Sequence, residues 1–298
     1  MPWQRIITAL IMLALALYAI FFLPLETFSG VVAIIVLIGS WEWTGFFIKK
    51  NPLLKILYVL ITAALMWVIY NNSLPQEYWN GWVIPEGIKE WLLLRDFALI
   101  SVVLACIWWV FAFVLVLVFP KLSSSLIHNM FLMAIIGWLM LLPTWVALTG
   151  VRSIGMAMDF HRGSSLLLFS LCLVWAADTG AFIAGKALGK HKLAPHVSPK
   201  KTWEGVFGGS LLAVLVAIIA SHYLSISDEQ LPGLAIMVVI IVTYSVIGDL
   251  TESIFKRMAG VKDSGNILPG HGGVLDRIDG LTAAMPLCLL GFAILGIN

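Results

Sequence analysis

Long apolar runs separated by short polar segments dominate the hydropathy pattern of this chain. A membrane-spanning helix needs roughly 20 consecutive apolar residues. Nine runs are long enough, at about 6–23, 29–48, 53–70, 97–119, 127–149, 164–188, 204–223, 233–252 and 280–297. No small-residue cleavage site follows the first run, so we expect it to be an uncleaved span. The pattern predicts an all-α, polytopic integral membrane protein with about nine transmembrane helices.

Strict alternation of nine spans assigns each loop to one side of the membrane, and the cationic residues divide unequally between the sides. Fourteen of the eighteen lie on the side of the N-terminus: Arg5, Lys49, Lys50, Lys55, Lys121, Lys186, Lys190, Lys192, Lys200, Lys201, Lys256, Arg257, Lys262 and Arg277. Because cytoplasmic loops are enriched in Lys and Arg, we expect a cytoplasmic N-terminus and a C-terminus outside.

This topology divides the chain into three segments. Residues 1–96 hold the first three spans and an outer segment that we expect to lie on the membrane surface. Residues 97–163 hold spans four and five. Residues 164–298 hold spans six to nine, with cytoplasmic loops at 186–203 and 253–279.

Composition agrees with a multi-span membrane protein. Mean hydropathy is +1.00, 61% of the residues are hydrophobic and only 11% are charged. A net charge of +2 without a basic tail gives no indication of a nucleic-acid partner. Thirteen Trp residues predict aromatic belts at the two membrane surfaces. Cys106, Cys172 and Cys288 lie inside apolar runs without metal-like spacing, so we interpret them as packing residues.

One stretch, Ser253 to Asp279, concentrates charge and glycine in this apolar chain, and two acids precede it. The polar residues of this region are Asp249, Glu252, Ser253, Lys256, Arg257, Lys262, Asp263, His271, Asp276, Arg277 and Asp279. Ionisable groups at membrane depth are functional candidates. Carboxylates hold hard cations, cationic side chains hold phosphate oxygens, and Gly272 and Gly273 let backbone amides approach an anion. The stretch therefore predicts a site for a metal-bound polyphosphate.

The spacing of the acids brings them together. Asp249, Glu252 and Lys256 are spaced i, i+3 and i+7, so one helical face presents all three. Asp276 and Asp279 share a face at the start of the ninth span, where a helix N-terminus stabilises carboxylates. Salt bridging and first-turn preference are the structural alternatives.

Two further polar features lie outside this stretch. Asp178 stands among small residues that favour close helix packing, either as a buried acid bonded within the bundle or as a group lining the catalytic cavity. Ser198, Lys200, Lys201 and Thr202 precede the seventh span, where a helix N-terminus can bind an anion; contact with lipid headgroups is the alternative. Glu42 is expected to be capped by local hydrogen bonds, with a place at the site as the alternative.

The order of these residues is that of a known family. The run matches Ser-x-apolar-Lys-Arg, four residues, Lys-Asp, then Pro-x-His-Gly-Gly-apolar-x-Asp-Arg-apolar-Asp, without a departure. It resembles the signature of the phosphatidate cytidylyltransferases, or CDP-diacylglycerol synthases. Members also carry Ala-Asp-x-Gly-Ala and Ser-Pro-x-Lys-Thr-x-x-Gly, which match the chain at 177–181 and 198–205. The matches cover roughly residues 174–285; before residue 150 the chain resembles the family mainly in being membrane spans.

The resemblance implies transfer of CMP from CTP to phosphatidic acid, giving CDP-diacylglycerol and pyrophosphate. The implied setting is the bacterial inner membrane, with a cytoplasmic active site, Mg²⁺ as cofactor, the number of ions left open, and a homodimer. We expect Asp249, Asp276 and Asp279 to hold the metal. The expected catalytic residues are Asp249, Lys256, Arg257, Lys262, Asp263, His271, Asp276, Arg277 and Asp279. The expected substrate-binding residues are Asp178, Ser198, Lys200, Lys201, Thr202, Glu252, Ser253, Gly272 and Gly273.

Three other functions are weighed against this one. A CTP-dependent enzyme acting on another lipid phosphate or a polyprenol would share the chemistry but not the full signature. A CDP-alcohol phosphotransferase is disfavoured because its Asp-Gly-x-x-Ala-Arg pattern is absent from the sequence. A transporter with intramembrane acids is disfavoured because the charges gather on one side and the sequence shows no inverted repeat.

Overall fold

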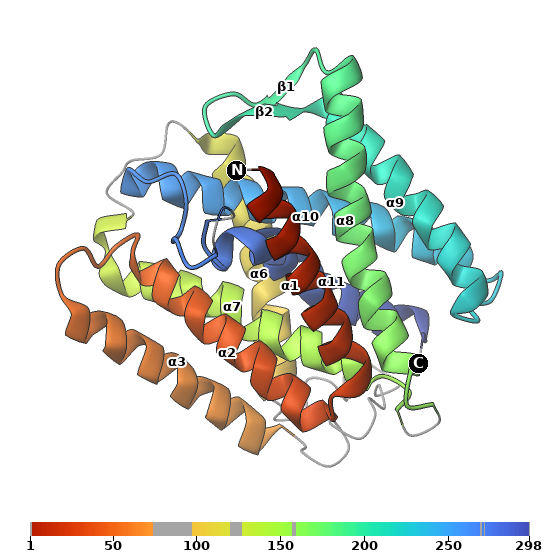
Figure 1. The fold of residues 1–298 in the computed structure, drawn as a ribbon, viewed down its shortest axis with the longest axis horizontal. Coiled ribbons are helices and arrows are strands. Elements are labelled where there is room, and N and C mark those ends of the chain that lie inside the picture. Colours follow the sequence, from red (N-terminus) through yellow and green to blue (C-terminus); the bar gives the residue numbers. More distant parts are fainter. Residues whose placement is uncertain are drawn as a thin grey trace.

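The computed structural model describes residues 2–73, 97–119, 127–156, 159–268, 270 and 272–297, with only the backbone described for 2–6. The described part contains nine α-helices and one β-hairpin (Figure 1). The helices are α1 (Pro2–Phe22), α2 (Leu25–Thr44), α3 (Pro52–Asn72), α6 (Phe97–Val118), α7 (Met130–Ser153), α8 (Arg162–Leu188), α9 (Trp203–Tyr223), α10 (Leu231–Ala259) and α11 (Leu275–Leu295).

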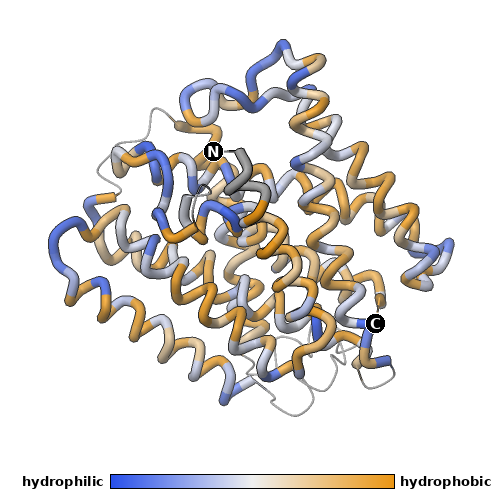
Figure 2. Tube along the Cα trace, in the orientation of Figure 1, coloured by the Kyte–Doolittle hydropathy of each residue, from blue (hydrophilic) through white to orange (hydrophobic). Residues whose placement is uncertain are grey.

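The predicted spans are confirmed. Each of the nine predicted runs corresponds to one helix, and eight helices are long and apolar enough to cross a membrane. In the remaining helix, α1, the apolar stretch Ile7–Phe22 is shorter. Figure 2 shows the helices as mainly hydrophobic, with hydrophilic residues gathered in the segments that join them. The predicted outer surface segment lies mostly outside the described residues.

The predicted loop at 253–279 is shorter than expected, because helices extend into it from both ends. Helix α10 continues to Ala259 and α11 begins at Leu275. Gly260 ends α10 with a φ of +75°, and the amide of Val261 donates to the carbonyl of Lys256 at 2.9 Å. Glycine adopts such a left-handed conformation without strain. The loop proper is residues 260–274, called here the signature loop.

The predicted loop at 186–203 also contains regular structure. Strands β1 (Lys192–Ala194) and β2 (Ser198–Thr202) form an antiparallel hairpin beyond the end of α8 (Figure 1). The Glu204 carboxylate lies 2.7 Å from His191 Nδ1 and closes the base of the hairpin. Val197, at its turn, is 3% exposed and packs with Leu250 and Ile254 of α10. A polar segment is thus held as a hairpin against the helix that carries the acids.

Helices α8 and α9 lie side by side because small residues let their backbones approach (Figure 1). A β-carbon at Gly180 would lie 2.6 Å from the carbonyl oxygen of Gly208, and one at Gly209 would lie 2.5 Å from that of Ala177. Larger side chains at these glycines would force the helices apart. The packing predicted for the small residues around Asp178 is confirmed.

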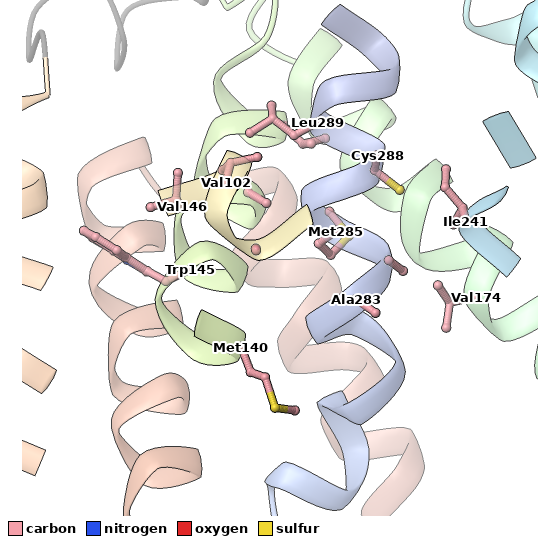
Figure 3. Close-up of a cluster of buried hydrophobic side chains, with 14 of the residues drawn as sticks. Val102, Met140, Trp145, Val146, Val174, Ile241, Ala283, Met285, Cys288 and Leu289 are labelled. Carbon is pink, nitrogen blue, oxygen red and sulfur yellow. The ribbon is translucent and has the colours of Figure 1, made fainter. Parts of the chain in front are cut away.

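Helices α7 and α11 occupy the interior of the bundle, and their buried side chains meet those of α6, α8 and α10 (Figure 3). The core contains residues from all three of the segments into which we divided the chain. Cys288 is buried in it, and all three cysteines are free, as expected for packing residues.

The prediction that the Trp residues form surface belts is wrong for several of them. Trp43, Trp109 and Trp145 are at most 3% exposed. Their indole nitrogens donate to the carbonyls of Met133, Thr282 and Ser29, respectively. A buried indole needs an acceptor for its N–H, and carbonyls of neighbouring helices supply it. These residues join helices to one another.

Candidate active site

The polar residues singled out in the sequence come together where α8, the hairpin, α10 and α11 meet. The described members of this polar cluster are Asp178, Lys201, Asp249, Glu252, Lys256, Asp276, Arg277 and Asp279. The sequence separates them by up to about a hundred residues. The fold unites them because α10 and α11 pack together and the hairpin returns to α10.

One half of the polar cluster centres on Asp249. Lys201 of β2 places its Nζ 2.6 Å from Asp249 Oδ2, and Ser253 donates to Asp249 Oδ1 at 3.3 Å. Asp178, exposed on α8, lies close enough to Lys201, Asp249 and Arg277 for their charges to act on it. Which of the two interpretations of Asp178 holds stays a prediction.

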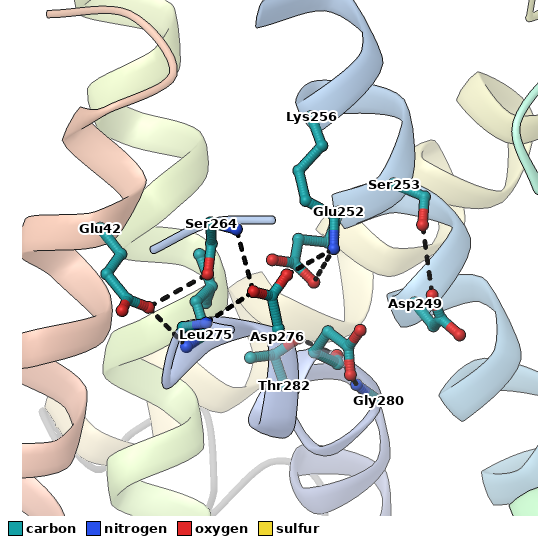
Figure 4. Close-up of polar contacts among 12 residues, drawn as sticks. Glu42, Asp249, Glu252, Ser253, Lys256, Ser264, Leu275, Asp276, Gly280 and Thr282 are labelled. Carbon is teal, nitrogen blue, oxygen red and sulfur yellow. Dashed lines mark hydrogen bonds and ion pairs between the residues drawn. The ribbon is translucent and has the colours of Figure 1, made fainter. Parts of the chain in front are cut away.

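The other half centres on Lys256, which bridges two acids (Figure 4). Its Nζ lies 2.7 Å from Asp276 Oδ1 and 3.2 Å from Glu252 Oε2. The Glu252 side chain has no exposed surface, and Asp279 is near enough to act on its charge. Because a buried carboxylate is costly without a counter-charge, Lys256 keeps this group of acids together. Of the three residues predicted to share a face, Glu252 and Lys256 form an ion pair, which was the structural alternative, whereas Asp249 pairs with Lys201.

Asp276 also holds the signature loop. Its Oδ2 accepts from the amide of Ser264 at 2.9 Å and from the amide of Gly273 at 2.8 Å. Gly272, with φ of +85°, lies so close that a β-carbon there would be 2.8 Å from Asp276 Oδ2. Both oxygens of Asp276 are therefore engaged by the protein. In this conformation the glycines make room for carboxylates, and their contact with phosphate stays a prediction.

Glu42 contacts the signature loop, which was the less favoured of the two interpretations of this residue. Glu42, near the end of α2, is 4% exposed. It accepts hydrogen bonds from Ser264 Oγ at 3.1 Å, from the Val274 amide at 3.0 Å and from the Leu275 amide at 2.7 Å (Figure 4). The expectation of local capping is wrong, because the partners lie 222 to 233 residues away. The sequence feature that could have indicated this contact is the position of Glu42 between Trp41 and Trp43 at the end of an apolar run.

The remaining predicted residues are exposed or serve the scaffold. Arg257, Lys262, Asp263 and Lys200 are exposed, and Ser198 is half-buried in β2. Thr202 caps α9 by accepting from the Gly205 amide at 3.1 Å, so its hydroxyl already has a structural use. His271 lies outside the described residues.

The acids offer the ligand type that Mg²⁺ prefers. Asp249 and Asp279 are close enough to act on each other's charge, and an oxygen-binding cation between them would relieve the repulsion. No group of three metal-ligating side chains is preassembled in the described part of the chain. Mg²⁺ is commonly bound by one or two carboxylates together with substrate phosphates. The donor set therefore fits a cation that enters with a polyphosphate.

Comparison with known proteins agrees with this chemistry. The model of the Cytidylyltransferase family matches residues 3–295. A phosphatidate cytidylyltransferase of Haemophilus influenzae is 37% identical over 287 residues, covering 95% of this chain and 96% of that protein. One of Pseudomonas aeruginosa is 38% identical over 284 residues, covering 95% and 94%. One of Brucella suis is 47% identical over 137 residues, 46% of this chain and 50% of that protein. The chain belongs to the cytidylyltransferase family.

Proposed function

We propose that this chain is a phosphatidate cytidylyltransferase, which transfers CMP from CTP to phosphatidic acid and releases pyrophosphate, leaving CDP-diacylglycerol. The observation that carries the proposal is the polar cluster of alternating acids and cations in a bundle of membrane-spanning helices. Two curated relatives of nearly full length carry this name.

The arrangement fits a reaction between two phosphates. The phosphate of phosphatidic acid is already ionised near neutral pH, so the attacking oxygen needs little help from a general base. Phosphoryl-type transfer depends on positioning and on neutralising charge. Lys201, Lys256 and Arg277 belong to the polar cluster. These cations supply the positive charge that the triphosphate and the lipid phosphate require.

We assign the metal to Asp249 and Asp279 rather than to Asp276. Both carboxylate oxygens of Asp276 already accept hydrogen bonds, from Lys256 and from two amides of the signature loop. We therefore assign Asp276 the role of supporting this loop. A bound Mg²⁺ supplies polarisation of the phosphate oxygens and a counter-charge for the leaving pyrophosphate. Lys201 would release Asp249 and bind phosphate instead when the nucleotide enters.

An apolar cavity of about 230 Å³ gives the lipid tails a place beside the acids. It is lined by α6, the hairpin, α9 and α10, with Trp203 and Leu250 among its residues. Trp203 follows Lys201 by two residues and Leu250 follows Asp249 by one, so two residues that line the cavity lie close in sequence to the partners of the Lys201–Asp249 ion pair. Exposed rim residues Phe113 and Leu117 continue it onto the apolar surface of α6. An acyl chain could therefore stay in hydrocarbon while the phosphate reaches the cluster.

The protein is a multi-pass membrane protein. We further propose that it lies in the bacterial inner membrane with the polar cluster at the cytoplasmic face, because fourteen of its eighteen cationic residues fall on that side of the predicted topology. The nucleotide is found on that side. A homodimer, which the family resemblance suggests, stays a prediction.

The test is pyrophosphate release by the purified protein in detergent, with phosphatidic acid and each of the four nucleoside triphosphates. We expect release with CTP that stops when the metal is chelated. Turnover with another lipid phosphate but not with phosphatidic acid would keep the chemistry and reject the substrate. No release with any lipid phosphate would reject the proposed function.

A further inference from the structure

Glu42 belongs to the first half of the chain, yet its side chain bonds directly to the signature loop and to the start of α11. Its carboxylate accepts from three donors: the hydroxyl of Ser264, the amide of Val274 at the N-cap of α11, and the amide of Leu275, the first residue of that helix. A helix N-terminus carries partial positive charge, so the position suits a carboxylate. Glu42 thus caps a helix that is more than two hundred residues away in the sequence.

The loop is shaped to receive this carboxylate. A β-carbon at Gly273 would lie 2.6 Å from Glu42 Oε2, and one at Gly265 would also collide with the Glu42 carboxylate. Both glycines therefore have a steric reason to lack a side chain. The Glu42 carboxylate therefore packs closely against the signature loop at both Gly265 and Gly273.

The end of α2 that carries Glu42 is itself held firmly. The neighbouring Trp43 has no exposed surface, and its indole donates to the Met133 carbonyl of α7 at 2.8 Å. Its ring also packs edge-on against Phe255 of α10, with ring centroids 5.1 Å apart. Phe255 directly precedes Lys256 in α10, so Trp43 packs against the same helix that carries the cation of the polar cluster.

Glu42 and Asp276 both accept hydrogen bonds from the signature loop. Ser264 donates its hydroxyl to Glu42 and its amide to Asp276. Three consecutive backbone amides are also divided between the two carboxylates. The amide of Gly273 donates to Asp276, and those of Val274 and Leu275 donate to Glu42. Asp276 in turn binds Lys256. A displacement of Glu42 would therefore be passed through two hydrogen bonds to Asp276 and through a third to Lys256.

We propose that Glu42 is a positioning residue for the cytidylyl transfer: it fixes the signature loop and the first turn of α11, and so keeps Asp276 and Lys256 in place. It contacts donors of the protein itself, so its effect on the reaction is indirect. This inference rests on the proposed function. A misplacement of about 1 Å can lower the rate roughly a hundredfold.

The experiment compares Glu42→Gln with Glu26→Gln, which changes the same residue type on the same helix at an exposed position. In Glu42→Gln the amide nitrogen faces N–H or O–H donors, so at least one of the three bonds is lost. We expect kcat of the folded enzyme to fall about 10- to 100-fold with little change in KM for CTP. Glu42→Asp, which keeps the charge, should recover part of the rate, and Glu26→Gln should match the wild type.

Two further measurements separate positioning from general stability. Ser264→Ala removes the same hydroxyl bond from the other side, so its effect on kcat should be non-additive with that of Glu42→Gln. Hydrogen exchange followed by mass spectrometry should show faster exchange in Glu42→Gln confined to the signature loop and the start of α11. Equal kcat in Glu42→Gln and Glu26→Gln would overturn the proposal, and so would additive effects or faster exchange throughout α2 and α7. If the wild type released no pyrophosphate, the proposed function would fail, while exchange would still decide whether Glu42 holds the loop.

Discussion

The bond between Lys256 and Asp276 should matter as much for stability as for activity. Nζ and Oδ1 are 2.7 Å apart, and the two side chains are only 10% and 6% exposed. Removing one partner of a buried ion pair costs about 3–5 kcal/mol because the other charge is left in a poor environment. Asp276→Asn would leave Lys256 with Glu252 alone at 3.2 Å.

The remaining contacts of Asp276 and Lys256 indicate how much the free energy of unfolding should fall in Asp276→Asn. The Asn side chain keeps one oxygen that can accept from the amides of Ser264 and Gly273, although these bonds lose the assistance of a charge. Glu252 retains part of the attraction for Lys256. We therefore expect Asp276→Asn to lower the free energy of unfolding by about 2–4 kcal/mol, at the lower side of the range for buried pairs.

Asp249→Asn is the matched comparison. Asp249 also forms an ion pair, but the side chains of Lys201 and Asp249 are 25% and 38% exposed. Pairs open to solvent contribute about 0–1 kcal/mol, so this variant should unfold close to the wild type.

The assay is denaturant unfolding of both variants in the same detergent, followed by Trp fluorescence. The midpoint for Asp276→Asn should lie clearly below that for Asp249→Asn. Equal midpoints would refute the assignment of Asp276 as a structural support and would return it to the metal ligands.

Three other outcomes are expected. Asp249→Asn should stay folded yet lose pyrophosphate release at least about a hundredfold, since it removes a charge needed for the transfer; near wild-type activity would contradict the metal assignment. Gly273→Ala should lower the unfolding midpoint because its β-carbon meets Glu42, whereas Gly30→Ala, with open space around it, should not; equal midpoints would argue against the close fit of the loop. Val246→Trp places a larger side chain in the apolar cavity and should raise KM for long-chain but not short-chain phosphatidic acid. Ile240→Trp, at an exposed position of the same helix, is the control. Equal effects on both substrates would argue against an acyl site in the cavity.

Much of the site was predictable from local sequence. The run from Ser253 to Asp279, with Asp249 and Glu252 before it, indicated a phosphate and metal site, and the structure brings Glu252, Lys256 and Asp276 of this region together. The spacing of Glu252 and Lys256 predicted their contact because an α-helix repeats every 3.6 residues. The division of roles was not predictable: Asp276 and Asp279 looked alike in the sequence, but only Asp276 meets the amides of the signature loop.

The membrane spans follow from the sequence alone, because the length and hydropathy of a run decide whether a helix can lie in hydrocarbon. Contacts between distant segments depend on how those helices pack, and packing leaves no periodic signal in the chain. Three features depend on such packing: the pairing of Lys201 with Asp249, the packing of Val197 of the hairpin against α10, and the burial of Trp43, Trp109 and Trp145. Glu42 is the clearest case: its neighbours in sequence are apolar and aromatic, and only the arrangement of α2 against α11 gives its charge the amides that stabilise it.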